Sequence, residues 1–137
     1  MLGAQGDVAD ELRYPSEWAA DVVLSDGRPA HIRAIRPDDA HELVRFHESL
    51  SANTVYYRFF APYPELSQRD VRRFTTVDHV DRVALVATVG ESIVAVGRYD
   101  VVSPGTAELA FTVRDDHQGR GLGSVLLEHL AAVARAA

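Results

Sequence analysis

The 137-residue sequence contains no cysteine and no lysine. Without cysteine the chain has no disulfide framework, no thiolate nucleophile and no cysteine-ligated metal. All 14 basic residues are arginine, which excludes the lysine-dependent phosphate loop and Schiff-base chemistry. Long hydrophobic runs are also missing, and the N-terminus has no basic start followed by an apolar core. We therefore expect a cytoplasmic protein.

The charge balance is acidic, with a formal net charge of -6. Nucleic acid and anionic membrane surfaces reward a basic face, so neither is an expected partner. Hydrophobic residues make up 47% and charged residues 25% of the chain, a composition typical of a folded globular protein. The length fits one domain.

The N-terminal part of this chain differs in character from the remainder. Residues 1–19 are polar and interrupted by Pro15, so we expect a flexible arm there and a single domain over residues 20–137. That domain begins with two β-prone runs on either side of residues 25–28, where Asp26-Gly27 favours a hairpin turn.

Helical signals cluster between residues 38 and 76. Apolar residues recur at helical spacing from Ala40 to Leu50, and His47 lies on that apolar face as a core histidine. Ser51 can cap a second, short helix over residues 52–60. Ser67, with Asp70 three residues later, has the spacing that opens a third helix.

The next block changes to β-structure. Residues 82–90, 92–102 and 107–113 alternate with turns at Gly90-Glu91 and Pro104-Gly105, which predicts three antiparallel strands. A leucine-rich helix with an apolar stripe from Leu122 to Val133 closes the chain. The order of hairpin, helices, strands and helix predicts an α+β (α/β) domain.

Three glycines alternate with other residues in "QGRGLGS", residues 118–124, where the last strand ends and the last helix begins. A helix start presents unpaired backbone N–H groups, and glycine lets an anion approach them closely. The segment can equally be a tight turn in which glycine serves only conformation. A dinucleotide fingerprint fits poorly, because Ser124 stands at the position of its last glycine.

The segment matches Q/R-x-x-G-x-G/A and so resembles the acetyl-CoA motif of the GNAT superfamily of N-acetyltransferases. Upstream, "IRAIRPDDAHELVRFHESLS", "YYRFFAPYPELS" and "DHVDRVALVA" are similar to the acetyltransferase domains of bacterial Pat-type protein lysine acetyltransferases. The resemblance implies a GNAT-like fold, with a mixed, mostly antiparallel sheet and flanking helices. It also implies acetyl-CoA as the acetyl donor and the amine of a protein lysine as the acceptor.

The resemblance also implies which residues bind acetyl-CoA. The loop amides would hold the pyrophosphate, and the pantetheine arm would pair with the end of the preceding strand like an added strand. The implied positions are Phe111, Thr112, Val113, Gln118, Gly119, Arg120, Gly121, Leu122, Gly123 and Ser124. None of the six histidines has acidic partners at metal-ligand spacing, so we expect no metal.

Glu108 is the candidate catalytic base. Strand alternation places it on one face with Ala110 and Thr112, while Leu109, Phe111 and Val113 occupy the other. Spacing alone allows an ordinary surface carboxylate. The match to Pat-like enzymes implies that Glu108 deprotonates the acceptor amine, directly or through a water. His117 beside Asp116 is a weaker candidate that we interpret as a structural pair.

The resemblance leaves three points open. The acceptor can be a protein lysine, with acyl-CoA synthetases as candidate substrates, or a small-molecule amine. The domain can instead be a non-catalytic module that senses acyl-CoA. A GNAT domain normally continues beyond the helix after the loop, so we expect this chain to be a fragment or another polypeptide to complete its sheet. Either case leaves its independent activity open.

Overall fold

The computed structural model describes residues 14–51, 65–119 and 121–136. Its described strands form a five-stranded antiparallel sheet in the order β1-β2-β3-β4-β5, with β5 at one edge. The strands are β1 (Ala20–Val23), β2 (Pro29–Ala34), β3 (Arg82–Val89), β4 (Ser92–Ser103) and β5 (Thr106–Val113). The α-helices are α2 (Ala40–Glu48), α4 (Gln68–Thr75) and α5 (Leu122–Ala136), and the 3-10 turns are η1 (Ser16–Trp18), η2 (Pro37–Asp39) and η3 (Asp115–His117).

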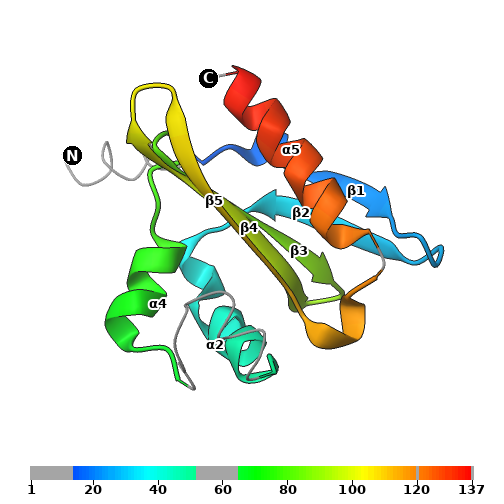
Figure 1. Cartoon of the computed structure of the whole chain (residues 1–137). Helices are drawn as coiled ribbons and strands as arrows, with labels where there is room; N and C mark the ends of the chain where they lie inside the picture. Colours follow the sequence, from blue (N-terminus) through cyan, green and yellow to red (C-terminus); the bar gives the residue numbers. More distant parts are fainter. Residues whose placement is uncertain (1–13, 52–64, 120, 137) are drawn as a thin grey trace, which may run out of the picture.

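The helices cover opposite faces of the sheet (Figure 1). On one face, α5 inserts Leu122, Leu126 and Leu130, each at most 1% exposed, into a core with β2, β3 and β4. On the other face, α2 inserts Leu43 and Phe46 into a second core, with Leu66 and Phe74 packed against it. This arrangement confirms the α+β fold, and it leaves β5 between the two helical layers.

Most predicted elements are present where their local signals lie. The β1–β2 hairpin turns at Asp26-Gly27, and Gly27 has a φ of 85°, a left-handed conformation that favours glycine. Ser67 caps α4 by accepting a hydrogen bond from the Asp70 N–H at 3.1 Å. The helix expected over residues 52–60 lies outside the described residues. No helix in the described ranges is long and apolar enough to cross a membrane.

A buried ion pair ties the hairpin to the first helix. Arg33 on β2 donates two hydrogen bonds to the Asp39 carboxylate, at 2.8 and 2.6 Å, and Asp39 is only 5% exposed. The Asp39 carboxylate also accepts from the Arg36 N–H at 2.9 Å. The hydrogen bonds from Arg33 to Asp39 raise the pKa of the Arg33 guanidinium, although burial of Arg33 acts in the opposite direction. This two-point ion pair fixes the start of α2 relative to β2.

Part of the expected N-terminal arm is packed against the domain. Within the described residues 14–19, the Tyr14 hydroxyl donates to the Ala34 carbonyl at 2.7 Å, and Trp18 packs against the core beneath α5. Both rings also lie nearly perpendicular to the His79 ring, with ring centroids 5.7 Å apart for Tyr14 and 6.0 Å apart for Trp18. Burial of these aromatic rings explains why Tyr14–Trp18 is ordered despite its polar neighbours in the sequence.

His79 lowers stability when it is protonated. Its backbone is left-handed, with a φ of 60°, and its buried Nδ1 has no hydrogen-bond partner. Burial lowers the pKa of His79, and the nearby Asp78 carboxylate only partly opposes this shift. The neutral ring therefore contributes stability that is fully present above the unfolded-state pKa of about 6.5 and is lost as pH falls below it.

Urea unfolding across this range tests the effect. The free energy of unfolding of the parent chain is expected to fall between about pH 7.5 and 5. His79→Asn tolerates the left-handed backbone but cannot titrate, so this variant should lose much of that slope. His41→Asn, at an exposed position on α2, is the control. An identical slope in parent and His79→Asn would assign the effect to other groups.

Candidate functional site

The glycine loop connects η3 to α5, and its backbone passes through the left-handed region. Gly119 and Gly121 have φ values of 80° and 83°, and apart from the glycine and its chain neighbours no described residue has an atom within 4 Å of where a Cβ would stand at either position. Packing therefore does not require glycine here, but the left-handed conformation favours it. Arg120 lies outside the described residues.

The start of α5 offers backbone donors next to this loop. The Val125 N–H donates to the Gly121 carbonyl at 3.0 Å, which is the first turn of helical bonding. The N–H groups of Leu122, Gly123 and Ser124 therefore lie in the turn that has no intrahelical acceptor. Leu122 itself is 1% exposed, so it can serve a ligand only through its backbone. Together with the helix dipole, these donors suit an anion.

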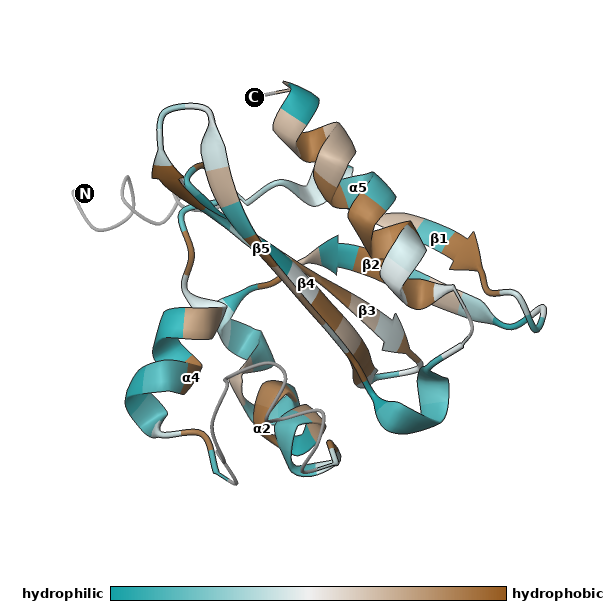
Figure 2. Cartoon of the chain, viewed as in Figure 1, coloured by the Kyte–Doolittle hydropathy of each residue, from teal (hydrophilic) through white to brown (hydrophobic). Residues whose placement is uncertain are grey.

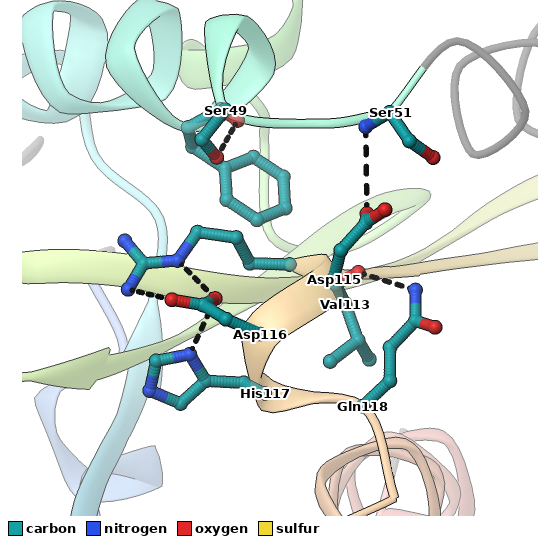
Figure 3. A network of polar contacts seen from close by, with 9 residues as sticks. Ser49, Ser51, Val113, Asp115, Asp116, His117 and Gln118 are labelled. Atoms are coloured by element: carbon teal, nitrogen blue, oxygen red, sulfur yellow. Dashed lines mark hydrogen bonds and ion pairs between the residues drawn. The ribbon is translucent and has the colours of Figure 1, made fainter.

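The turn before the loop is held by charged hydrogen bonds (Figure 3). Arg114 donates to both oxygens of Asp116, at 2.7 and 3.1 Å, and the His117 Nδ1 lies 2.9 Å from Asp116 Oδ1. The hydrogen bonds from Arg114, and then the contact with His117, lower the pKa of Asp116 to about 2. This network involves His117, which is 8% exposed, and it supports a structural role for the Asp116–His117 pair.

Gln118 links the loop back to the end of β5. Its Nε2 donates to the Val113 carbonyl at 3.1 Å (Figure 3). The Arg114 N–H donates to the Val94 carbonyl on β4 at 2.8 Å. Backbone groups alternate in direction along an antiparallel strand, so those of Val113 and Phe111 point away from β4, toward the free edge. Thr112 instead directs its backbone toward β4.

The two faces of β5 follow the expected alternation. Phe111 and Val113 pack against the core beneath α5, and the Phe111 ring would lie 3.0 Å from a Cβ on Gly97. Ala110 and Thr112 face α2 and α4. Phe111 and Val113 therefore keep their side chains in the core, and an added strand could use only their backbone.

A small cavity of about 40 Å³ lies between the sheet and the two helices on the Ala110 side. It is lined by Leu43, Phe46, His47, Leu50, Leu66, Phe74, Val96, Arg98, Ala110 and Thr112. His47 and Arg98 are 5% and 7% exposed, and the Arg98 guanidinium lies 4.7 Å from the Phe74 ring centroid. The burial of His47 agrees with its place on the apolar face of the predicted helix. The burial of Arg98 could not be predicted, because a charged residue in the middle of a strand gives no local sign of burial.

Glu108 lies at the exposed end of β5, on the same face as this cavity. Asp100 stands directly opposite it on β4. Two carboxylates side by side on one face make that end of the sheet attractive to a cation, although Arg82 lies 3.6 Å from Asp100. In the described ranges, no three metal-binding side chains gather at one place.

Among the described residues, the glycine turn, the first turn of α5 and the outward backbone groups of β5 follow one another in the chain and suit an extended anionic ligand. A profile of the family described as "Acetyltransferase (GNAT) family" matches residues 43–137. The chain therefore belongs to the GNAT acetyltransferase family, which confirms the resemblance inferred from the loop.

Comparison with solved structures and curated proteins shows which members of the family this chain resembles. The crystal structure of the GNAT domain of S. lividans PAT superposes with a TM-score of 0.85 at 56% identity, over 89% of this chain and 74% of that one. Acetyltransferase PA5475 of Pseudomonas aeruginosa is 36% identical over 117 residues, or 82% of this chain. Acetyltransferase Pat of Mycolicibacterium smegmatis is 30% identical over 110 residues, or 77% of this chain.

These matches define a Pat-type GNAT domain. The chain spans 63% of the length of the Pseudomonas relative and 33% of the Mycolicibacterium relative.

Proposed function

We propose that this chain is an acetyl-CoA-dependent N-acetyltransferase domain that modifies the side-chain amine of a protein lysine. The observation that carries the proposal is the glycine loop. Its left-handed glycines and the first turn of α5 provide open backbone donors beside the free edge of β5. Similarity to the S. lividans PAT domain and to Pat of M. smegmatis supports protein lysine as the acceptor class.

The residues present fit acetyl-CoA. The N–H groups at residues 121–124 would hold its pyrophosphate, with the dipole of α5 adding to the attraction. The outward backbone groups of Phe111 and Val113 would pair with its pantetheine arm. Gln118 occupies the Val113 carbonyl, so the Val113 N–H and both backbone groups of Phe111 are the ones free to pair. When bound, acetyl-CoA supplies the thioester carbonyl that accepts the amine.

Glu108 would accept the proton that the lysine must lose. The lysine pKa is about 10.4, so deprotonation at pH 7 costs roughly 4 to 5 kcal/mol. A carboxylate at hydrogen-bond distance, or one water away, lowers this barrier as a general base. Asp100 opposite Glu108 adds negative charge that attracts the ammonium before the proton is transferred. This chemistry favours a cationic amine as acceptor.

Mass spectrometry distinguishes the candidate acceptors. The chain is incubated with acetyl-CoA and either an acyl-CoA synthetase, our candidate protein substrate, or a small aliphatic diamine. We expect a mass increase of one acetyl group on a lysine of the protein and a much slower reaction with the diamine. Faster transfer to the diamine would replace the proposal with a small-molecule acetyltransferase. Acetyl-CoA binding without any transfer would indicate a sensing module.

A further inference from the structure

A second, larger depression lies outside the loop and β5. It is a groove of about 530 Å³ between α2 and α4, lined by Ala40, His41, Val44, Leu66, Gln68, Val71 and Arg72. The walls are mostly aliphatic, and the polar side chains of His41, Gln68 and Arg72 come from both helices. Such a groove suits the apolar face of a short peptide segment.

The helix α4 beside this groove is basic in an otherwise acidic protein. Arg69, Arg72 and Arg73 are exposed on α4, whereas the chain as a whole has a net charge of -6. Arg72 lines the groove, and helical spacing places Arg69 and Arg73 next to Arg72 on the adjoining exposed side of α4. Asp70 is the single acidic residue of α4 and is half-buried. Figure 2 shows α4 as mostly hydrophilic beside the more apolar α2.

Other charges around the groove are mixed. Arg36, exposed next to η2, adds to the basic side, while Asp38 and Glu65 are exposed acidic residues nearby in the chain. Glu42 on α2 lies 3.9 Å from Arg45, which offsets part of its charge. The concentrated positive charge is therefore that of α4.

The groove lies on the side of the sheet that carries Glu108. α2 and α4 pack on the face to which Ala110 and Thr112 point, and Glu108 shares that face by strand alternation. A protein held in the groove would therefore approach the sheet from the side of the candidate base.

We propose that the α2–α4 groove docks an acidic amphipathic segment of the acceptor protein. Apolar side chains of that segment fill the groove, and its carboxylates pair with Arg69, Arg72 and Arg73. This inference rests on the proposed function, because it assigns the recognition surface of that same reaction. Arginine suits the role, since its planar fork pairs with carboxylates at two points.

Binding is measured without turnover, so that failure of catalysis does not obscure it. The probe is a roughly 15-residue peptide with leucine at helical spacing and glutamate elsewhere, titrated into the isotope-labelled chain. We expect amide shifts at Val44 and Val71 and weaker binding as salt is raised. The same peptide with lysine in place of glutamate is the control. Equal binding of both peptides, no shift in α2 or α4, or tighter binding of a single-stranded oligonucleotide or an anionic vesicle would overturn the proposal.

Kinetics with variants give the second test. Arg69→Glu/Arg72→Glu/Arg73→Glu should raise the KM for the protein acceptor at least about tenfold. Its kcat and its KM for a short lysine peptide should stay within about twofold. Arg135→Glu, exposed on α5, is the matched control. Arg72→Glu alone is used if the triple variant unfolds.

An unchanged KM for the protein acceptor would refute docking at the α2–α4 groove. If the parent chain transfers no acetyl group to any protein, the proposed function fails. The peptide titration then decides the groove by itself.

Discussion

Glu108→Gln is expected to lower kcat for acetyl transfer at pH 7 by about 10²- to 10⁴-fold, the range typical of losing a general base. The affinity for acetyl-CoA should stay unchanged, because Glu108 lies five residues before the end of β5, away from the loop. Above neutral pH a larger fraction of the acceptor amine is already deprotonated. The rate of the variant should therefore rise about tenfold per pH unit until the pH nears the lysine pKa of about 10.4.

Glu91→Gln is the matched control, since Glu91 is an exposed carboxylate in the β3–β4 turn, away from the loop. Its kinetics should equal those of the parent chain. A Glu108→Gln rate within about twofold of the parent at pH 7 would rule out Glu108 as the base. Loss of acetyl-CoA binding in this variant would instead assign Glu108 to the cofactor site.

Gly121→Val is expected to weaken acetyl-CoA binding by roughly 10- to 100-fold. At a φ of 83°, a β-branched residue is strained, and relief of the strain moves the backbone donors that begin α5. Calorimetry with acetyl-CoA measures the change in Kd. Helical content, followed by circular dichroism, should be retained because Leu122, Leu126 and Leu130 still bury α5.

Gly27→Val provides the control for backbone strain. Gly27 has a φ of 85° and, like Gly121, has open space where its Cβ would lie. It stands in the β1–β2 turn, so its replacement should lower stability by about 1 to 3 kcal/mol without changing Kd. If both variants bind acetyl-CoA like the parent, the glycines serve only as turn residues.

The fold arises from local signals in the sequence. The hairpin at Asp26-Gly27, the Ser67 cap of α4 and the leucine stripe of α5 each depend on residues close together in the chain. Periodicity and turn chemistry report such features directly. For the same reason the two faces of β5 could be predicted, and with them the face that carries Glu108.

The parts of the site that could not be predicted depend on contacts between distant segments. Arg98 is buried because α4 brings Phe74 over it, and the cavity beside it combines two helices with two strands. The sequence places Asp116 beside His117, but the two hydrogen bonds that Asp116 accepts from Arg114 depend on how η3 turns. The hydrophobic periodicity of the sequence does not report contacts between residues that are far apart in the chain. The packing of Tyr14 against His79 could not be predicted for the same reason.

We propose that the backbone of this loop binds the pyrophosphate of acetyl-CoA. The most direct measurement is an acetyl-CoA titration of the isotope-labelled chain, followed through its backbone amide resonances. We predict that the largest shifts occur at Gly119 and at residues 121–124, with smaller shifts at Phe111 and Val113. Saturation with acetyl-CoA that leaves these amides unmoved, or no binding at all, would contradict the account.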